Sequence, residues 1–221
     1  MTQLMQKELD RLKKQLLTLS AVVEEGVQQA TRALEKNDVP LAQKVISTDE
    51  KINQMEVELE EECLKVLALH QPVAIDLRYI IAVMKINNDL ERIGDLASNI
   101  AERSVALAAG PRIAAPFDYL GMAGKAQAML KGSLDCLVQM DTRLAHKVLE
   151  LDDEIDQQHK DNFSLIKQEI LAHPENLEPL SQYLTVSRHL ERIADLATNI
   201  AEDVYYMIEG EIVRHVKSWG K

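Results

Sequence analysis

The sequence predicts an all-α protein built as two pseudo-symmetric three-helix bundles, produced by duplication of one unit. The main observation is a repeated segment. Residues 90–102 read LERIGDLASNIAE, residues 190–202 read LERIADLATNIAE, and the two agree at eleven of thirteen positions. Helix-forming residues dominate the composition, and apolar residues recur at three- and four-residue spacing. A long internal repeat indicates an architecture assembled from copies of one supersecondary unit.

The duplication covers most of each half. The segment Leu41-Ala42-x-Lys44-Val45 recurs as Leu144-Ala145-x-Lys147-Val148, at an offset of 103 instead of 100 residues. Between the halves, residues 109–117 contain one glycine and two prolines in a chain poor in both. Such residues mark a break between elements. We therefore predict two domains, residues 1–110 and 116–215.

Each half is expected to hold three long antiparallel helices. Apolar residues form a helical stripe over residues 4–34, and a second helix should run from about 39 to 69, ending before Pro72. Because proline is tolerated in a first helical turn, a third helix is predicted from Pro72 to about residue 108. The second half repeats this plan with helices over roughly 118–141, 143–172 and 175–210. The short connections allow only antiparallel neighbours.

Charge and composition exclude several classes of protein. A net charge of −11 argues against nucleic acid and anionic lipid as primary partners. No apolar run reaches eighteen residues and the first residues lack a signal-peptide core, so we expect a cytoplasmic protein that is not inserted in a membrane. Cys63 and Cys136 should be buried, reduced thiols. The sequence has no glycine-rich phosphate loop, nucleophile elbow or CxxC pair, and we predict no catalytic residues.

The repeated segment carries a stripe of acidic and amide side chains. At 100° per residue, Glu91, Asp95, Asn99 and Glu102 fall within about 80° of the helix circumference, opposite the apolar residues. The same stripe recurs at Glu191, Asp195, Asn199 and Glu202. One explanation is a solvated polar face whose charge is offset by neighbouring arginines. The other is a metal site, because carboxylates at i, i+4 on one helix can converge on a cation.

The middle helix of each half supplies matching acids. Asp152 and Asp156 have the same i, i+4 spacing, and their counterparts in the first half are Asp49 and Asn53. Two adjacent helices with such pairs could surround one metal ion or a small cluster. Oxygen ligands suit hard or borderline divalent or trivalent cations without fixing their identity. Since an amide is a weaker ligand than a carboxylate, the second site is expected to bind metal better.

Several motifs together resemble the PhoU family of phosphate-uptake regulators. They are Gln71-Pro72-Val73-Ala74-Ile75-Asp76-Leu77-Arg78, LERIGD at residues 90–95 and Asn99-Ile100-Ala101-Glu102. The resemblance implies two three-helix bundles and surface metal clusters, with iron reported in some members. The family's E(D)xxxD motifs fall on Glu91/Asp95 and Glu191/Asp195, with Asp49, Asp152 and Asp156 as partner ligands and Asn99, Glu102, Asn199 and Glu202 as further ligands or their neighbours.

The second half departs from this pattern, because residues 174–179 read PENLEP where the first half has QPVAIDLR. Any interaction made by Asp76 and Arg78 is therefore expected to be confined to the first bundle. The alternative for these two residues is structural. Asp76 would be an acid at a helix start, and Arg78 would be held in a salt bridge.

The resemblance implies a regulatory role and no catalysed reaction. PhoU-like proteins are negative regulators that connect the ATPase subunit of a phosphate ABC transporter to a sensor histidine kinase, and a homodimer is expected. Two alternatives stay open. One is a metal-storage or metal-buffering protein. The other is a di-metal phosphatase or oxidase, which would need a histidine in each metal site and a pocket, and the sequence provides neither.

Overall fold

The structure, a computed structural model, describes residues 3–211, and every regular element in that range is helical. The predicted fold class is confirmed. The first half contains α1 (Gln3–Lys36), α2 (Val39–His70) and α3 (Ala74–Ala109). The second contains α4 (Tyr119–Gln139), α5 (Thr142–Ala172), a short 3-10 turn at Pro174–Asn176 and α6 (Leu177–Glu209). Residues 212–215, which we assigned to the second domain, lie outside the described residues.

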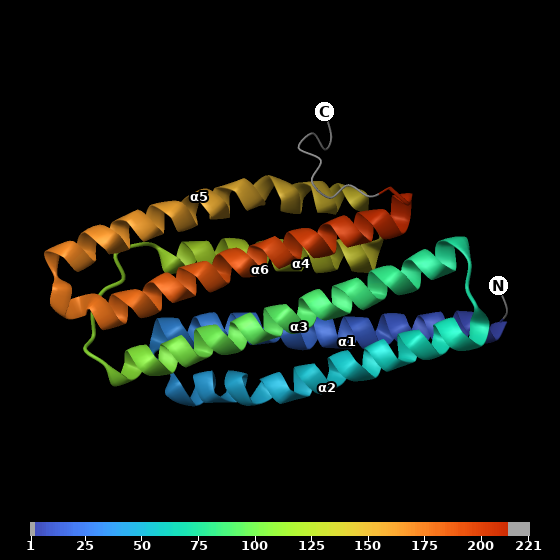
Figure 1. The fold of residues 1–221 in the computed structure, drawn as a ribbon, viewed down its shortest axis with the longest axis horizontal. Coiled ribbons are helices and arrows are strands. Elements are labelled where there is room, and N and C mark those ends of the chain that lie inside the picture. The colour runs from blue at the N-terminus through green and yellow to red at the C-terminus, as the bar shows by residue number, and fades with distance from the viewer. Residues whose placement is uncertain (1–2, 212–221) are drawn as a thin grey trace.

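The two bundles lie side by side along their long axes (Figure 1). Helix α3 packs along α6 over most of its length, and α1 contacts α4. Helices α2 and α5 form the two outer edges of the molecule, so each is partnered only within its own bundle. The α2–α3 and α5–α6 connections lie at opposite ends of the molecule. Figure 1 shows the α2–α3, α3–α6 and α5–α6 pairs on one face of the molecule, and we call the seam along each helix pair a groove.

The cores follow the predicted apolar stripes. Leu90, Ile93, Ala97 and Ile100 are at most 1% exposed, as are their counterparts Leu190, Ile193, Ala197 and Ile200. Full burial of an aliphatic side chain of this size contributes about 1.5–3 kcal/mol each. The apolar side of the repeated segment therefore holds each bundle together, which leaves its acidic side free for another role.

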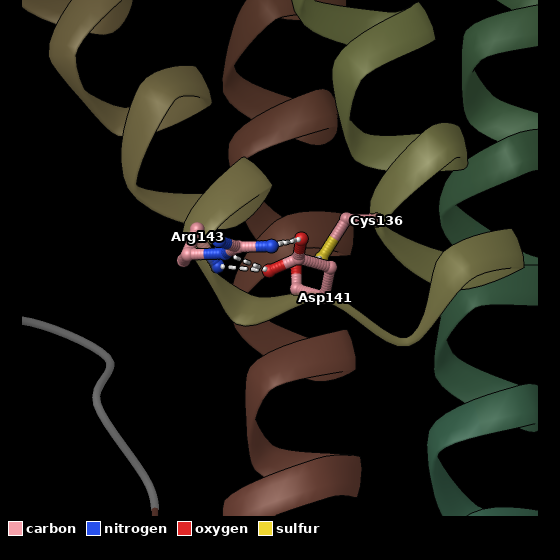
Figure 2. A network of polar contacts seen from close by, with 3 residues as sticks. All are labelled: Cys136, Asp141 and Arg143. Atoms are coloured by element: carbon pink, nitrogen blue, oxygen red, sulfur yellow. Dashed lines mark hydrogen bonds and ion pairs between the residues drawn. The ribbon is translucent and has the colours of Figure 1, made fainter.

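The turn between α4 and α5 shows how the chain reverses direction. Helix α4 ends at Met140 in the left-handed conformation, and Asp141 then caps α5 by accepting a hydrogen bond from the Arg143 N–H (Figure 2). The Arg143 guanidinium also binds this carboxylate, and these hydrogen bonds lower the pKa of Asp141 to about 2. The first half uses the same device, with Asp38 capping α2 through the Leu41 N–H. The caps fix where each middle helix begins.

The predicted start of α3 was wrong by two residues. Gln71 adopts the left-handed conformation at the end of α2, Val73 is extended, and α3 begins only at Ala74. Pro72 therefore lies in the connection and not in the first turn. The remaining helix ends agree with the prediction to within a few residues, apart from the 3-10 turn that precedes α6. Both cysteines are buried free thiols, as expected.

Candidate metal centre

The α5–α6 groove brings three predicted ligands together. One carboxylate oxygen from each of Asp156, Glu191 and Asp195 lies within 4.8 Å of the other two. Asp156 comes from α5, and the other two residues stand one turn apart on α6. Asp152 lies one turn before Asp156 and accepts a hydrogen bond from Thr198 Oγ1 at 3.2 Å. The spacing expected from the sequence thus produces a convergent oxygen-ligand group.

The raised pKa values in this groove reflect partial burial first and crowded negative charge second. Partial burial of its carboxyl group, followed by the charges of Glu191, Asp152 and Asp156, raises the pKa of Asp195 to about 6. Burial is also the largest cause of the raised pKa values of Glu191 and Asp152, with neighbouring carboxylates adding to it. A cation between these groups would remove that repulsion, because it replaces like-charge contacts with attractive ones.

The α2–α3 groove carries the corresponding residues in a weaker arrangement. Burial and the charge of Asp95 raise the pKa of Asp49, whereas a hydrogen bond from Asn53 lowers it. Burial and the charges of Asp95, Glu56 and Asp49 raise the pKa of Glu91. Within residues 3–211, no group of three acids converges here as it does in the second groove. The amide of Asn53, in the place of Asp156, explains the difference.

The donor sets fit a hard or borderline cation in both grooves, although more closely in the second. In the first groove, Asp49 Oδ1 is buried and has no hydrogen-bond partner, a position that a cation would satisfy. Glu102 is less available to a cation, because its carboxylate forms an ion pair with Arg103 at 2.9 Å. Three other predicted residues, Asn99, Asn199 and Glu202, are half-buried on the same helices and stand outside the convergent group.

The structure agrees with the structural explanation for Asp76 but not for Arg78. Asp76 is an acid in the first turn of α3, as the structural alternative expects. Arg78, however, forms no salt bridge with any described residue, and its Nε is buried without a partner. Its guanidinium lies against Gly210 at the end of α6, where a Cβ would collide with it. Arg78 thus contacts the second bundle, and the expectation that the interaction of Asp76 and Arg78 has no counterpart in the second half stays a prediction.

A polar network inside the second bundle was not predicted from the sequence. Ser187 Oγ lies 2.9 Å from His159 Nδ1 and accepts a hydrogen bond from Asn162 Nδ2 at 3.0 Å. Ser187 is fully buried, so this serine–histidine pair is closed to a substrate. His159 lies one turn from Asp156 on α5. The i, i+3 spacing of Asp156 and His159 was visible in the sequence. The partner of His159 is Ser187 of α6, and the sequence does not show how α6 lies against α5.

Exposed apolar side chains gather at the ends of the bundles. Leu69, Val73 and Ile75 surround the α2–α3 connection and are each at least 68% exposed. Leu171 and Leu177 flank the α5–α6 connection and are 74% and 55% exposed. Among the described residues, no helix is both long and apolar enough to cross a membrane. Contiguous exposed apolar residues on a protein surface are typical of sites that meet another macromolecule.

Comparison with known proteins identifies the family. The PhoU domain model matches residues 16–104 and again residues 119–204, so the matches start 103 residues apart and end 100 residues apart. These are the two offsets of the repeats. A PhoU homolog of the phosphate-specific transport system from Aquifex aeolicus is 41% identical over 209 residues, covering 95% of both chains. A Pseudomonas aeruginosa homolog described in the same words is 37% identical and covers 95% of this chain and 87% of its own length.

Solved structures agree with the sequence relatives. The crystal structure of PhoU from Pseudomonas aeruginosa matches with a TM-score of 0.89 at 36% identity, covering 93% of this chain and 99% of that one. The phosphate transport system regulatory protein PhoU from Streptococcus pneumoniae matches with a TM-score of 0.83 at 31% identity, covering 95% and 99%. Both halves of the fold are therefore shared over nearly the whole length. This chain belongs to the PhoU family.

Proposed function

We propose that this protein is a cytoplasmic accessory and regulatory protein of a phosphate-specific transport system. It restrains phosphate uptake and represses the phosphate-starvation response when phosphate is plentiful. It does so as an adaptor between the ATPase subunit of the phosphate ABC transporter and a sensor histidine kinase. The observation that carries this proposal is membership of the PhoU family across both repeats.

The architecture suits an adaptor. Two rigid bundles place exposed apolar residues at opposite ends of the molecule, around the α2–α3 and α5–α6 connections. Acidic grooves lie between these ends. When an acidic surface meets a basic patch on a partner, the complementary charge increases the encounter rate and the specificity more than the affinity. We expect the functional unit to be a homodimer. Sedimentation or light scattering of the purified protein tests that expectation directly.

Deletion of the gene tests the regulatory role. Without the protein, phosphate-starvation genes should stay expressed in phosphate-rich medium, because the link that silences the kinase is gone. Re-expression of the wild-type chain is the control and should restore repression. Normal repression in the deletion strain would remove the regulatory proposal. In a pull-down from lysate, the transporter ATPase or the kinase should be recovered, and recovery should fall as salt is raised.

Metal binding in the two grooves is the second part of the proposal. The bound cation would be held by Asp156, Glu191 and Asp195 in the second groove and by Asp49, Glu91 and Asp95 in the first. Each carboxylate would supply oxygen ligands and keep the two helices at a fixed separation. The metal would thereby stabilise the surface that partners recognise. Iron, manganese, zinc and magnesium are the candidates for titration, with iron clusters expected from the family.

A double substitution in each groove separates metal binding from a solvated polar face. Glu191→Ala with Asp195→Ala should abolish most metal uptake at the second site and leave the fold intact, because neither side chain belongs to the core. Glu91→Ala with Asp95→Ala is the matched control and should remove the weaker uptake. Equal metal content in the wild type and the first double variant would establish that the stripe is only a solvated face.

The alternative function is metal storage or buffering, favoured by the convergent acids of the second groove. Titration distinguishes the two functions. A few stoichiometric ions that are retained would favour a regulatory or structural metal, whereas high capacity with ready release would favour storage.

A further inference from the structure

The groove where the two bundles meet is lined by polar contacts that cross between α3 and α6. At one end Lys85 Nζ lies 3.3 Å from the buried carboxylate of Asp203. At the other end Arg103 Nη1 donates a hydrogen bond to Gln182 Oε1, also at 3.3 Å. The hundred-residue offset of the repeat relates Arg103 to Asp203. The two ends of this interbundle groove are therefore equivalent positions of the duplicated unit.

The two ends have diverged in charge. The first end combines Lys85, Asn88, Asp89 and Arg92 of α3 with Asp203 of α6, and its formal charges cancel. The equivalent positions at the second end have a formal charge of +3, with His189 neutral. They are Thr185, Arg188, His189 and Arg192 of α6 with Arg103 of α3. We call Arg103, Arg188, His189 and Arg192 the cationic end of the groove.

The side chains of the cationic end lie close to one another. Arg188, His189 and Arg192 fall within about one turn of α6, and Arg103 of α3 reaches that helix through its hydrogen bond to Gln182 Oε1. The charges of all three arginines act on the His189 ring. Glu102 offsets part of this charge through its 2.9 Å ion pair with Arg103, and Glu191 offsets part of the charge of Arg188 and Arg192. Arg188 and Arg192 are exposed, and neither forms an ion pair with any residue between 3 and 211. Positive charge is thus concentrated here in a protein that is acidic overall.

Two polar atoms at the cationic end lack hydrogen-bond partners. His189 Nδ1 and Arg103 Nε are both buried, and neither has a protein partner. Buried polar atoms are nearly always paired, so unpaired ones within a charged cluster point to a missing ligand. At the first end the residue equivalent to Arg103 is Asp203, and its carboxylate is paired with Lys85.

Neutralisation of the acidic grooves accounts for only part of this cluster. Arg192 and Arg188 lower the pKa of Glu191, and Arg92 has the same effect on Glu91 in the first bundle. Arg188, His189 and Arg103 nevertheless have no basic counterpart in the first half, where the equivalent residues are Asn88, Asp89 and Asp203.

We propose that the cationic end of the interbundle groove binds a phosphate-type oxyanion. Guanidinium groups stay charged at all working pH values and match the oxygens of a phosphate or phosphoryl group with paired N–H donors. Such an anion would contact both bundles, since Arg103 comes from α3 and the other three residues from α6. The ligand is free inorganic phosphate or a phosphoryl group carried by a partner, because both present the same oxygens.

Calorimetric titration of the purified full-length protein tests this site. Chelator is present throughout, so that phosphate cannot bind through a cation in the acidic grooves. The probes are inorganic phosphate and phosphoserine, with sulfate as a competitor. Arg192→Gln and Arg188→Gln should each weaken binding about tenfold or more, the usual effect of losing a charge-assisted hydrogen bond. Arg92→Gln, at the equivalent position of the first bundle, is the matched control and should change it less than about twofold.

The probes also separate the two sources of the ligand. Binding of inorganic phosphate alone would assign the free ion, and binding of phosphoserine alone would assign a phosphorylated partner. Failure of the wild type to bind either probe up to about 10 mM would overturn the proposal. Equal weakening by Arg92→Gln and Arg192→Gln would also overturn it. The measurement uses the isolated protein, so its result is independent of the deletion phenotype that tests the regulatory role.

Discussion

Asp195→Asn should make the metal-free protein more stable at neutral pH. The folded-state pKa of Asp195 is raised from 3.8 to about 6 by burial and by neighbouring carboxylates. Since each tenfold change in proton affinity corresponds to about 1.4 kcal/mol, that rise corresponds to about 3 kcal/mol before solvent screening. Although its carboxyl group is crowded by neighbouring groups, the Asp195 side chain remains open to solvent, so screening leaves an expected gain of about 1 kcal/mol. The substitution removes the charge and keeps the size of the side chain.

The sign of the pH dependence follows from the direction of the shift. Because the folded state holds the Asp195 proton more tightly than the unfolded chain, wild-type stability falls as pH rises from about 4 to about 6. The asparagine variant has no such proton to lose. The two proteins should therefore differ in unfolding free energy at pH 7.5 and converge near pH 4.

Urea unfolding followed by circular dichroism, with chelator present, measures this difference at both pH values. Adding metal at pH 7.5 should reverse the order, because the wild type retains all three carboxylates and the variant does not. Asp95→Asn in the first groove is the control and should have a smaller effect, since Asn53 replaces the third carboxylate there. A destabilised Asp195→Asn protein at pH 7.5, or a difference that persists at pH 4, would refute the argument from charge repulsion.

Two further predictions concern the scaffold. Gly210→Ala should lower the unfolding free energy by about 1–2 kcal/mol in urea titrations, because Gly210 has a φ of 81° and an added Cβ would collide with the Arg78 guanidinium. Cys63 and Cys136 should react with a thiol reagent at pH 8 only after unfolding, since burial raises the pKa of Cys63 to about 12 and of Cys136 to about 11. Rapid labelling of the native protein would contradict the latter.

The sequence was sufficient to predict the fold because its signals are local or repeated. Apolar spacing depends only on helix geometry, and it placed residues such as Leu90 and Ile193 in the core. The repeat related each residue of one half to its counterpart in the other, which requires no knowledge of long-range contacts. The acidic stripe was predictable for the same reason, since residues one turn apart on a helix share a face whatever surrounds it.

Contacts between the bundles could not be predicted in this way. Lys85 meets Asp203, and Arg78 meets Gly210, only because α3 and α6 run antiparallel in one particular register. Helical periodicity predicts the side of the helix on which each residue lies. It does not predict which residue of the neighbouring helix it will contact. The convergence of Asp156 with Glu191 was expected as a ligand pair, but the distance between them depends on the α5–α6 packing.

The duplication also allows a gain-of-function prediction. Asn53 is the position at which the first groove differs from the second, where Asp156 completes the three-carboxylate group. Asn53→Asp should create a comparable group with Glu91 and Asp95. The metal-free variant should be less stable than the wild type, because Asp49 loses its hydrogen bond from Asn53 and gains another negative neighbour.

Metal should reverse that loss, because the added charge attracts a cation that the wild-type groove holds weakly. Metal analysis after dialysis should then show tight binding at both grooves, and the extra binding should survive Glu191→Ala with Asp195→Ala in the second. An Asn53→Asp protein whose metal content and affinity equal those of the wild type would exclude the third carboxylate as the cause of the difference between the grooves. The difference would then have to come from the packing of α2 against α3, which the substitution leaves unchanged.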